Sequence, residues 1–316
     1  MEVVMIDKKN VKLCNSLKKT MKFFLFGLSI FSVLTLVGCR TMMTGILNPK
    51  GVITYEEKQL FVDALALMLI IIIPVFIMSC VFIVRYRASR KILDYQPNWG
   101  HSILLEAIWW GIPLAIILIL GSRTWTMSHK LDPYRPIEGV GKPMLLIQVV
   151  ALPWKWLFIY PEQNIATVNY LEIARSEQVK FVFTNDNVPM SAFFIPQLGS
   201  QIYTMAGMQT RLHLIASADG TYEGLDGQYN GDGFSDMCFK VKVVELNELQ
   251  QWFAVVKRSG KKLTPFVYQK LIKPSIKEPV HYYSSVVSNL FSQIMMKYMQ
   301  TTTGMPTQWE HKKPHY

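Results

Sequence analysis

Residues 220–246 read GTYEGLDGQYNGDGFSDMCFKVKVVEL. A Gly-Thr-Tyr strand end precedes a glycine-rich segment, and a strand with alternating apolar residues follows it. Loops of this shape in small all-β domains often hold copper between histidine, cysteine and methionine side chains. Residues 225–236 contain neither a cysteine nor a histidine. The stretch therefore predicts a β-sandwich loop that has the shape of a metal site but lacks the usual ligands.

The residues around this loop, 143–246, are expected to form an all-β domain. Short apolar runs alternate there with turn signals such as PEQN at residues 161–164. About a hundred residues of short strands favour a Greek-key sandwich. The expected strands lie at residues 144–152, 154–160, 166–174, 179–185, 211–217 and 238–246.

The composition indicates a membrane protein. The chain has 316 residues, of which 50% are hydrophobic, and a formal net charge of +11. Its lysines and arginines cluster beside apolar runs, where such charges set membrane topology, and no basic helix or aromatic stacking platform is visible. Nucleic-acid binding is therefore not expected. Because two of the four cysteines adjoin or lie inside apolar runs, no disulfide framework is available either.

The first apolar run, residues 23–38, follows three lysines and ends at Cys39. Its length and basic flank are typical of a secretory signal. The ending LVGC resembles a bacterial lipobox, so we expect a signal peptide over 1–38, a lipid attached to Cys39 and an exported segment over 39–59. A plain helix that contains a cysteine is the alternative, and an internal start at Met21 stays open.

Two longer apolar runs predict a transmembrane hairpin. Residues 64–84 and 103–122 are each long enough to span a bilayer core. We expect helices over 60–84 and 103–124, with the basic loop 85–102 in the cytoplasm by the positive-inside rule. Both ends of the hairpin then lie outside, in agreement with a lipid on Cys39. A linker over 125–142 leads to the exported sandwich.

The C-terminal segment, residues 247–316, is expected to be helical and to end in a basic tail. The stretches ELQQWFAVVKR (248–258) and YYSSVVSNLFSQIMMKYM (282–299) place apolar residues three and four positions apart, as amphipathic helices do.

This order of elements resembles subunit II of the haem-copper oxidases. Four stretches are similar to the bo-type ubiquinol oxidases of bacteria, and the similarity extends from the lipobox to about Met299. The resemblance implies a two-helix membrane hairpin followed by a cupredoxin-like Greek-key sandwich with C-terminal helices. The stretches are YRAS (86–89), PNWGHS (97–102), WKWLFIYPEQNIATVN (154–169) and FFIPQLGSQIYTMAGMQTRLHLIA (193–216).

In copper-bearing members of the superfamily the loop holds a dinuclear copper centre. The resemblance places Asp226 and Asn230 at the two cysteine positions, and only one of the aligned residues, Met237, matches a ligand. A mixed-valence copper pair needs bridging thiolates, whereas Cys238 is the only thiol of the domain and His213 its only histidine. We therefore expect no metal here. The other aligned positions are Ser191 and Phe234, at the two histidines, and Gln228, at the carbonyl donor.

The resemblance also implies a function. Electrons would come from ubiquinol within the membrane, and the haems and copper would belong to subunit I, which reduces oxygen to water and pumps protons. This chain would be a subunit without a redox centre in the bacterial inner membrane, with its C-terminal domain in the periplasm. Its partners would be subunit I, subunit III and a small subunit IV.

Glu106, in HSILLEAIWW, is the candidate site residue within the membrane region. Intramembrane carboxylates are costly unless they snorkel, pair or act. It is either an interfacial acid that reaches the headgroups or, as the resemblance implies, a proton relay at the mouth of a K-type pathway. Asp63 is expected to be a boundary residue. The alternating aromatic residues Trp154, Trp156, Phe158 and Tyr160 are expected to pack inside the sandwich.

Two other functions stay open on the sequence. The chain could be a copper-containing subunit II of a cytochrome c oxidase, or a lipid-anchored binding module with no oxidase partner. No nucleophile elbow, zinc spacing or phosphate loop suggests another enzyme.

Overall fold

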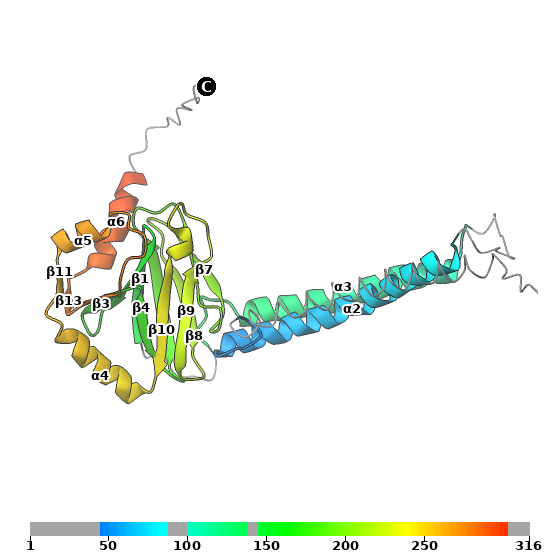
Figure 1. Ribbon diagram of the computed structural model, residues 1–316, viewed down its shortest axis with the longest axis horizontal. Coiled ribbons are helices and arrows are strands. Elements are labelled where there is room, and N and C mark those ends of the chain that lie inside the picture. Colours follow the sequence, from blue (N-terminus) through cyan, green and yellow to red (C-terminus); the bar gives the residue numbers. More distant parts are fainter. Residues whose placement is uncertain (1–44, 88–99, 138–144, 303–316) are drawn as a thin grey trace, which may run out of the picture. The chain divides into compact units, whose positions relative to one another are not determined.

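The computed structural model describes residues 45–87, 100–137 and 145–302. The predicted signal peptide, Cys39, most of the loop over 85–102 and the basic tail lie outside these residues. The described part contains two long helices, a two-sheet sandwich and a C-terminal segment of short helices and strands (Figure 1).

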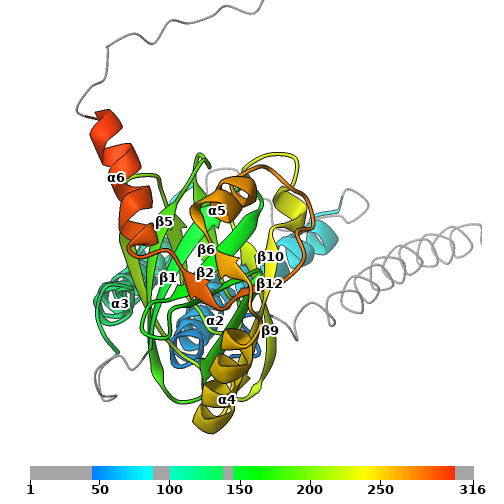
Figure 2. The same ribbon diagram turned by 90° about the vertical axis from the view of Figure 1, so that its left-hand side faces the viewer.

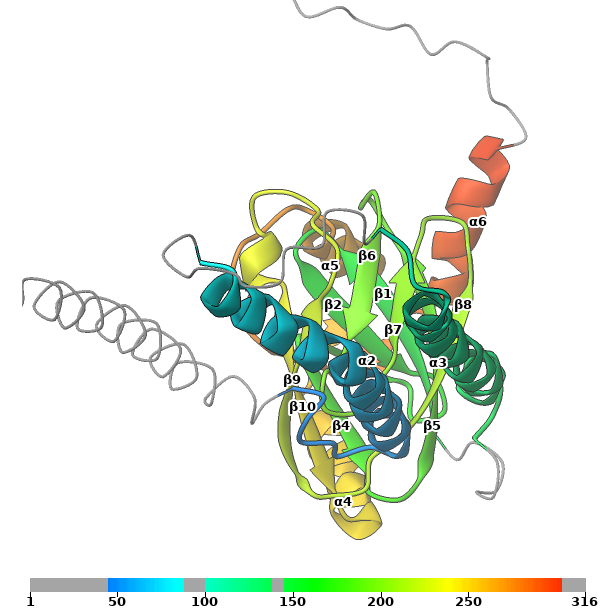
Figure 3. The same ribbon diagram turned by 90° about the vertical axis from the view of Figure 1, so that its right-hand side faces the viewer.

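Helices α2 (Val52–Arg85) and α3 (Ile103–Lys130) both extend away from the sandwich (Figures 1 and 3) and are long and apolar enough to cross a bilayer. Both extend beyond the apolar runs that predict them. The added turns are polar and are joined by ion pairs between the helices, Arg123–Asp63 at 3.4 Å and Lys130–Glu56 at 2.9 Å. Asp63 is therefore paired across the hairpin.

The sandwich consists of two mixed sheets that share one apolar core. The six-stranded sheet has the order β12-β3-β2-β1-β5-β8, and the five-stranded sheet has the order β4-β10-β9-β6-β7. The expected fold class, a hairpin of apolar helices plus a β-sandwich and C-terminal helices, is confirmed. The strands are β1 (Leu145–Leu152), β2 (Lys155–Tyr160), β3 (Ile165–Val168), β4 (Tyr170–Ala174), β5 (Gln178–Asn185), β6 (Ser191–Phe194), β7 (Gln201–Thr204), β8 (Thr210–Ile215), β9 (Gly220–Asp226), β10 (Cys238–Val244) and β12 (His281–Tyr283).

The run expected as one strand over 166–174 is divided between the two sheets. Asn169 separates β3 from β4 and has a left-handed φ of 54°, which asparagine tolerates better than most residues. Its side-chain oxygen accepts a hydrogen bond from Trp156 N at 2.9 Å, and its backbone oxygen accepts one from Lys240 N at 3.1 Å. Asn169 thus ties both sheets together at the point where the chain crosses between them.

The C-terminal segment differs from the helical segment expected after residue 246. Helix α4 (Leu246–Lys257) forms as predicted, but residues 281–283 become strand β12 and pair with β3, so they extend the six-stranded sheet. Pairing at this open sheet edge outweighs the helical spacing of 282–299, and helix α6 (Leu290–Thr302) starts only at Leu290. Strands β11 (Lys262–Leu263) and β13 (Ser285–Val286) and helix α5 (Pro265–Leu271) complete the segment.

Helices α5 and α6 cover the outer face of the six-stranded sheet (Figure 2) and form a second apolar cluster on it. Lys155, a buried residue of β2, attaches the end of α5 to the sheet. Its ammonium group donates to the backbone oxygens of Leu271 at 3.1 Å and Lys273 at 2.9 Å, near the end of α5, and lies 3.6 Å from Glu278. Burial lowers the pKa of Lys155, and the attraction of Glu278 opposes this effect.

The start of α2 is built into the sandwich. Lys50 N donates to Gln197 O at 2.8 Å, Lys50 O accepts from Ser217 N at 2.7 Å, and Ile53 belongs to the core between the sheets. A Cβ at Gly51 would lie 2.6 Å from Leu198 O, so this close approach requires glycine. The first turn of the hairpin therefore packs as part of the sandwich.

Candidate functional site

The β9–β10 loop (residues 227–237) is the site that the sequence singles out. Asp226 is the last residue of β9, and β10 begins directly after Met237. Strand β6 pairs with β9 next to the loop, with Phe193 opposite Asp226, and so brings Ser191 close to it. Local strand pairing thus gathers the residues that the resemblance aligns with copper ligands.

The side-chain amide nitrogen of Asn230 occupies the centre of this group. It lies 2.8 Å from Asp226 Oδ2, 3.1 Å from Ser191 Oγ and 3.1 Å from Met237 Sδ. Three of the other five aligned residues therefore contact Asn230 through their side chains. The contacts are hydrogen bonds from an amide donor, the strongest of them to a carboxylate.

Asp226 holds the loop to β6. Its carboxylate is 3% exposed, and Oδ1 accepts backbone hydrogen bonds from Ala192 at 2.7 Å and Gln228 at 3.0 Å. Burial raises the pKa of Asp226, and these hydrogen bonds together with Ser191 lower it in part. Among the described residues, none forms an ion pair with this carboxylate.

The other aligned residues lie outside this cluster. Gln228 contributes its backbone N–H only, and the ring of Phe234 packs against Tyr229 at 5.6 Å. Cys238 is exposed at the start of β10, where alternating burial turns Phe239 inward and the thiol outward. The only thiol of the sandwich thus points away from the site.

His213 is also remote from the loop. It lies on β8 in the six-stranded sheet, whereas the loop belongs to the five-stranded sheet. Its ring is buried under the segment that follows α3, where Nδ1 lies 3.1 Å from Pro133 O, and burial lowers its pKa. A neutral imidazole that donates from Nδ1 satisfies this contact.

The donor set of the loop does not fit a dinuclear copper centre. A carboxylate, a hydroxyl, a thioether and an amide nitrogen include no thiolate that could bridge two metal ions. The amide nitrogen carries hydrogens and offers no lone pair to a metal, yet the other three groups point at it. Across the three described ranges, no cluster of three or more histidine, cysteine, aspartate or glutamate residues could hold a metal ion.

The alternating aromatic residues pack as predicted. Trp156, Phe158 and Tyr160 are fully buried in β2, and Trp156 and Phe158 contact the rings of Phe193 and Phe239 between the sheets. Trp154 differs, because it occupies the turn before β2 with a φ of 59° and lies against the loop. Its indole nitrogen is 3.4 Å from Asn230 O.

Glu106 lies in the first turn of α3, far along the hairpin from the sandwich. Its Oε1 is 2.8 Å from Nδ1 of His101, and both side chains are more than half exposed, at 55% and 65%. The sequence analysis did not single out His101. A histidine five residues before an intramembrane glutamate is a usable signal, since an imidazole that precedes the helix can fold back onto its first turn.

Comparisons with known proteins give a consistent result. Residues 257–302 match the family described as COX Aromatic Rich Motif. The chain is 48% identical over 271 residues to cytochrome bo(3) ubiquinol oxidase subunit 2 of Pseudomonas aeruginosa, covering 86% of this chain and 80% of the relative. It is 45% identical over 285 residues to ubiquinol oxidase subunit 2 of Acetobacter aceti, covering 88% and 90%. Among solved structures, the periplasmic domain of subunit II of cytochrome oxidase (CoxB) of Bradyrhizobium japonicum matches 38% of this chain and 97% of its own, at 21% identity and a TM-score of 0.36.

Proposed function

Because this chain belongs to the family of subunit 2 of the cytochrome bo(3) ubiquinol oxidases, we propose that it serves a proton-pumping quinol oxidase without carrying a redox centre itself. The absence of a redox centre from this chain is supported by the hydrogen-bonded cluster around Asn230. An amide donor at the centre of the loop, with no thiolate nearby, leaves no ligand set for an electron-accepting copper pair.

Electrons then reach the complex by another route. A quinol is lipid-soluble and delivers electrons inside the membrane, so a receiving centre on the exported sandwich is unnecessary. The haems and the copper of oxygen reduction belong, in this proposal, to subunit I. Subunit III and a small subunit IV complete the complex.

We further propose that Glu106 takes part in proton uptake, with His101 beside it. A carboxylate in the first turn of a membrane helix needs a partner or a function. The contact of 2.8 Å between His101 Nδ1 and Glu106 Oε1 places an imidazole beside the carboxylate, and a proton can pass between two such groups in hydrogen-bond contact. An interfacial role for Glu106 would not require this contact.

The membrane arrangement follows the charge pattern. The basic residues between α2 and α3 favour a cytoplasmic loop, so the sandwich is periplasmic and the complex resides in the bacterial inner membrane. The LVGC sequence before residue 40 supports cleavage before Cys39 and attachment of a lipid to its thiol. The lipid and the hairpin would then both attach the chain to the membrane.

The proposal is tested by isolation of the tagged chain from membranes in mild detergent. Co-isolation of a haem-bearing subunit, together with oxygen uptake that depends on ubiquinol and not on a reduced cytochrome c, is the expected result. A chain isolated without haem proteins would instead be a lipid-anchored binding module. Oxygen uptake driven by cytochrome c would identify a copper-bearing oxidase.

A further inference from the structure

We propose that Met205, Met208 and Met299 form a surface site that binds a copper(I) ion through their thioether sulfurs. Met205 and Met208 are the ends of the Met-Ala-Gly-Met turn between β7 and β8, and Met299 lies on α6. The site is separate from the β9–β10 loop, and the proposed function assigns these residues no role.

The first two methionines are held together by the turn itself. Met208 N donates to Met205 O at 3.3 Å, which closes a reverse turn whose ends lie within about 7 Å of each other. Gly207 has a φ of +72°, in the left-handed region that favours glycine. The turn therefore has one defined shape, with a methionine at each end.

The third methionine is brought to this turn by α6. A Cβ placed on Gly207 would lie 3.1 Å from Tyr298 Cβ and 3.8 Å from Met299 N. The backbone of the turn is thus in contact with the helix at the residue from which Met299 extends. Because methionine has three rotatable bonds, the sulfurs of Met208 and Met299 can reach a common ion.

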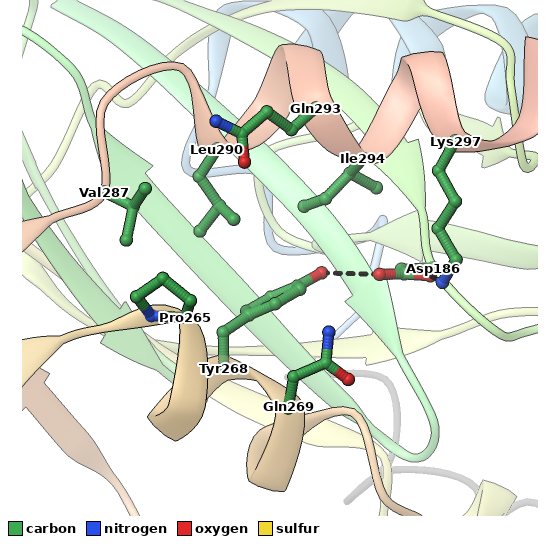
Figure 4. A pocket seen from close by; sticks show the side chains of 9 residues that line it. All are labelled: Asp186, Pro265, Tyr268, Gln269, Val287, Leu290, Gln293, Ile294 and Lys297. Carbon is green, nitrogen blue, oxygen red and sulfur yellow. Dashed lines mark hydrogen bonds and ion pairs between the residues drawn. The ribbon is translucent and has the colours of Figure 1, made fainter.

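The rotation of α6 is fixed by a buried carboxylate. Asp186 accepts hydrogen bonds from Tyr298 Oη at 2.6 Å and from Lys297 Nζ at 2.7 Å. Figure 4 shows Lys297 beside Asp186, with Ile294, a member of the apolar cluster, on the same helix. Tyr298 Oη also accepts a hydrogen bond from Asn187 N at 2.8 Å. These contacts fix the rotation of α6 where its backbone at Tyr298 and Met299 meets the turn, and the positive charge of Lys297 is balanced by Asp186.

The three methionine residues are open to solution. Met208 is 52% exposed and Met299 is 50% exposed, while Met205 is partly exposed. Met296, one turn earlier on α6, is 57% exposed and lies on the same side of the helix as Met299. Large apolar side chains gather at this surface although the interior offers them a more favourable environment.

The chemistry of these side chains selects the ion. Thioether sulfur is a soft, neutral ligand that favours copper(I), whereas calcium and magnesium prefer oxygen. Without a thiolate or an imidazole the site binds copper(I) reversibly, which suits storage or transfer better than electron conduction. If the proposed function holds, such a site would keep copper(I) on the exported face of a complex whose catalytic centre contains copper.

The site is tested by a copper(I) titration of the full-length chain in detergent, kept anaerobic and reduced, against a chromophoric copper(I) chelator. The unaltered chain is expected to retain a single copper(I) ion, with sulfur as the only heavy neighbour in its X-ray absorption spectrum. The variant M205L/M208L/M299L keeps the volume and exposure of the side chains. Since loss of even an outer partner weakens metal binding by about 10- to 100-fold, loss of the ligands themselves should weaken retention by at least as much.

Three matched variants identify the ligands. M190L removes a methionine outside the site, M237L removes the thioether of the β9–β10 loop, and C238S removes the exposed thiol. All three are expected to retain copper(I) as the unaltered chain does. The proposal is overturned if the unaltered chain retains no copper(I), if M205L/M208L/M299L still retains it, or if M237L or C238S loses it. None of these outcomes depends on quinol oxidation, so the proposed function stands or fails separately.

Discussion

The side-chain amide nitrogen of Asn230 lies 2.8 Å from Asp226 Oδ2, so the residues aligned with the two metal-bridging cysteines hydrogen-bond to each other. The same amide approaches Ser191 and Met237, and the carboxylate accepts two backbone N–H groups from neighbouring segments. A hydrogen-bonded cluster thus joins the β9–β10 loop to β6 and β9.

Replacement of Asn230 by alanine should loosen the β9–β10 loop. The change leaves the Asp226 carboxylate and the Ser191 hydroxyl with one partner fewer in a buried setting, which costs about 1–3 kcal/mol of the free energy of unfolding. Hydrogen exchange of residues 226–237 should accelerate, and the thermal midpoint should fall. Gln228→Ala keeps the backbone N–H that Gln228 donates to Asp226 and serves as the control in the same loop. Equal exchange rates in the two variants would contradict a structural role for the amide.

Asp226 should make the stability of the sandwich depend on pH. Its pKa is raised in the fold, so the folded state binds this proton more tightly than the unfolded chain does. Protonation of Asp226 therefore increases the free energy of unfolding as the pH falls from above the folded pKa of Asp226 to the lower pKa of an unfolded aspartate. This contribution is lost again as the pH rises through the folded pKa. The Asp226→Asn variant cannot titrate here.

The difference in thermal midpoint between the unaltered chain and Asp226→Asn should consequently shift in favour of the unaltered chain as the medium is acidified from neutral pH. Parallel melting curves over several buffers measure it. A difference that shifts the other way would mean that the carboxylate is ionised and well paired.

Asp186 should control the attachment of α6. Its carboxylate is buried and accepts from Tyr268, Tyr298 and Lys297, which come from two different helices. Asp186→Ala leaves these donors without their common acceptor and should cost about 3 kcal/mol or more. Limited proteolysis should then cut within residues 290–302. Asp219→Ala breaks an exposed ion pair with Arg175 and should leave the cleavage pattern unchanged.

Replacement of Glu106 by glutamine should slow oxygen reduction by the assembled complex severalfold. The amide keeps the shape of the side chain but cannot carry the proton. His101→Ala should give a smaller decrease, because the carboxylate loses its imidazole neighbour but keeps its own proton site. Asp63→Asn, at the other end of the hairpin, is the control. If the Glu106→Gln complex turns over as fast as the unaltered complex over the whole pH range, Glu106 has no role in proton uptake and is only an interfacial acid.

The apolar runs and alternating strands predicted most of the architecture because each reflects local burial. The differences arise where distant segments compete. Residues 281–283 form β12 because the edge of the sheet beside β3 is open, and no local pattern reveals that edge. The turns added to α2 depend on the Lys130–Glu56 pair, which joins residues far apart in the sequence.

The candidate site was partly predictable for the same reason. Missing thiols and histidines in residues 225–236 are visible in the sequence, and they predict a loop without copper ligands. That Asn230 would fill the centre of the loop depends on the side-chain directions of β6 and β9. Met299 likewise lies close to the Met205–Met208 turn because α6 packs there, and the spacing of these methionines in the sequence does not reveal this proximity.

The central claim is that this chain accepts no electrons through copper. It is tested most directly by the near-infrared absorption and electron paramagnetic resonance of the full-length chain in detergent after exposure to copper(II) and removal of the excess. We predict no near-infrared band and no mixed-valence signal, because the loop offers no pair of thiolates to bridge two copper ions. Two copper ions per chain with a near-infrared band and a delocalised mixed-valence signal would contradict it.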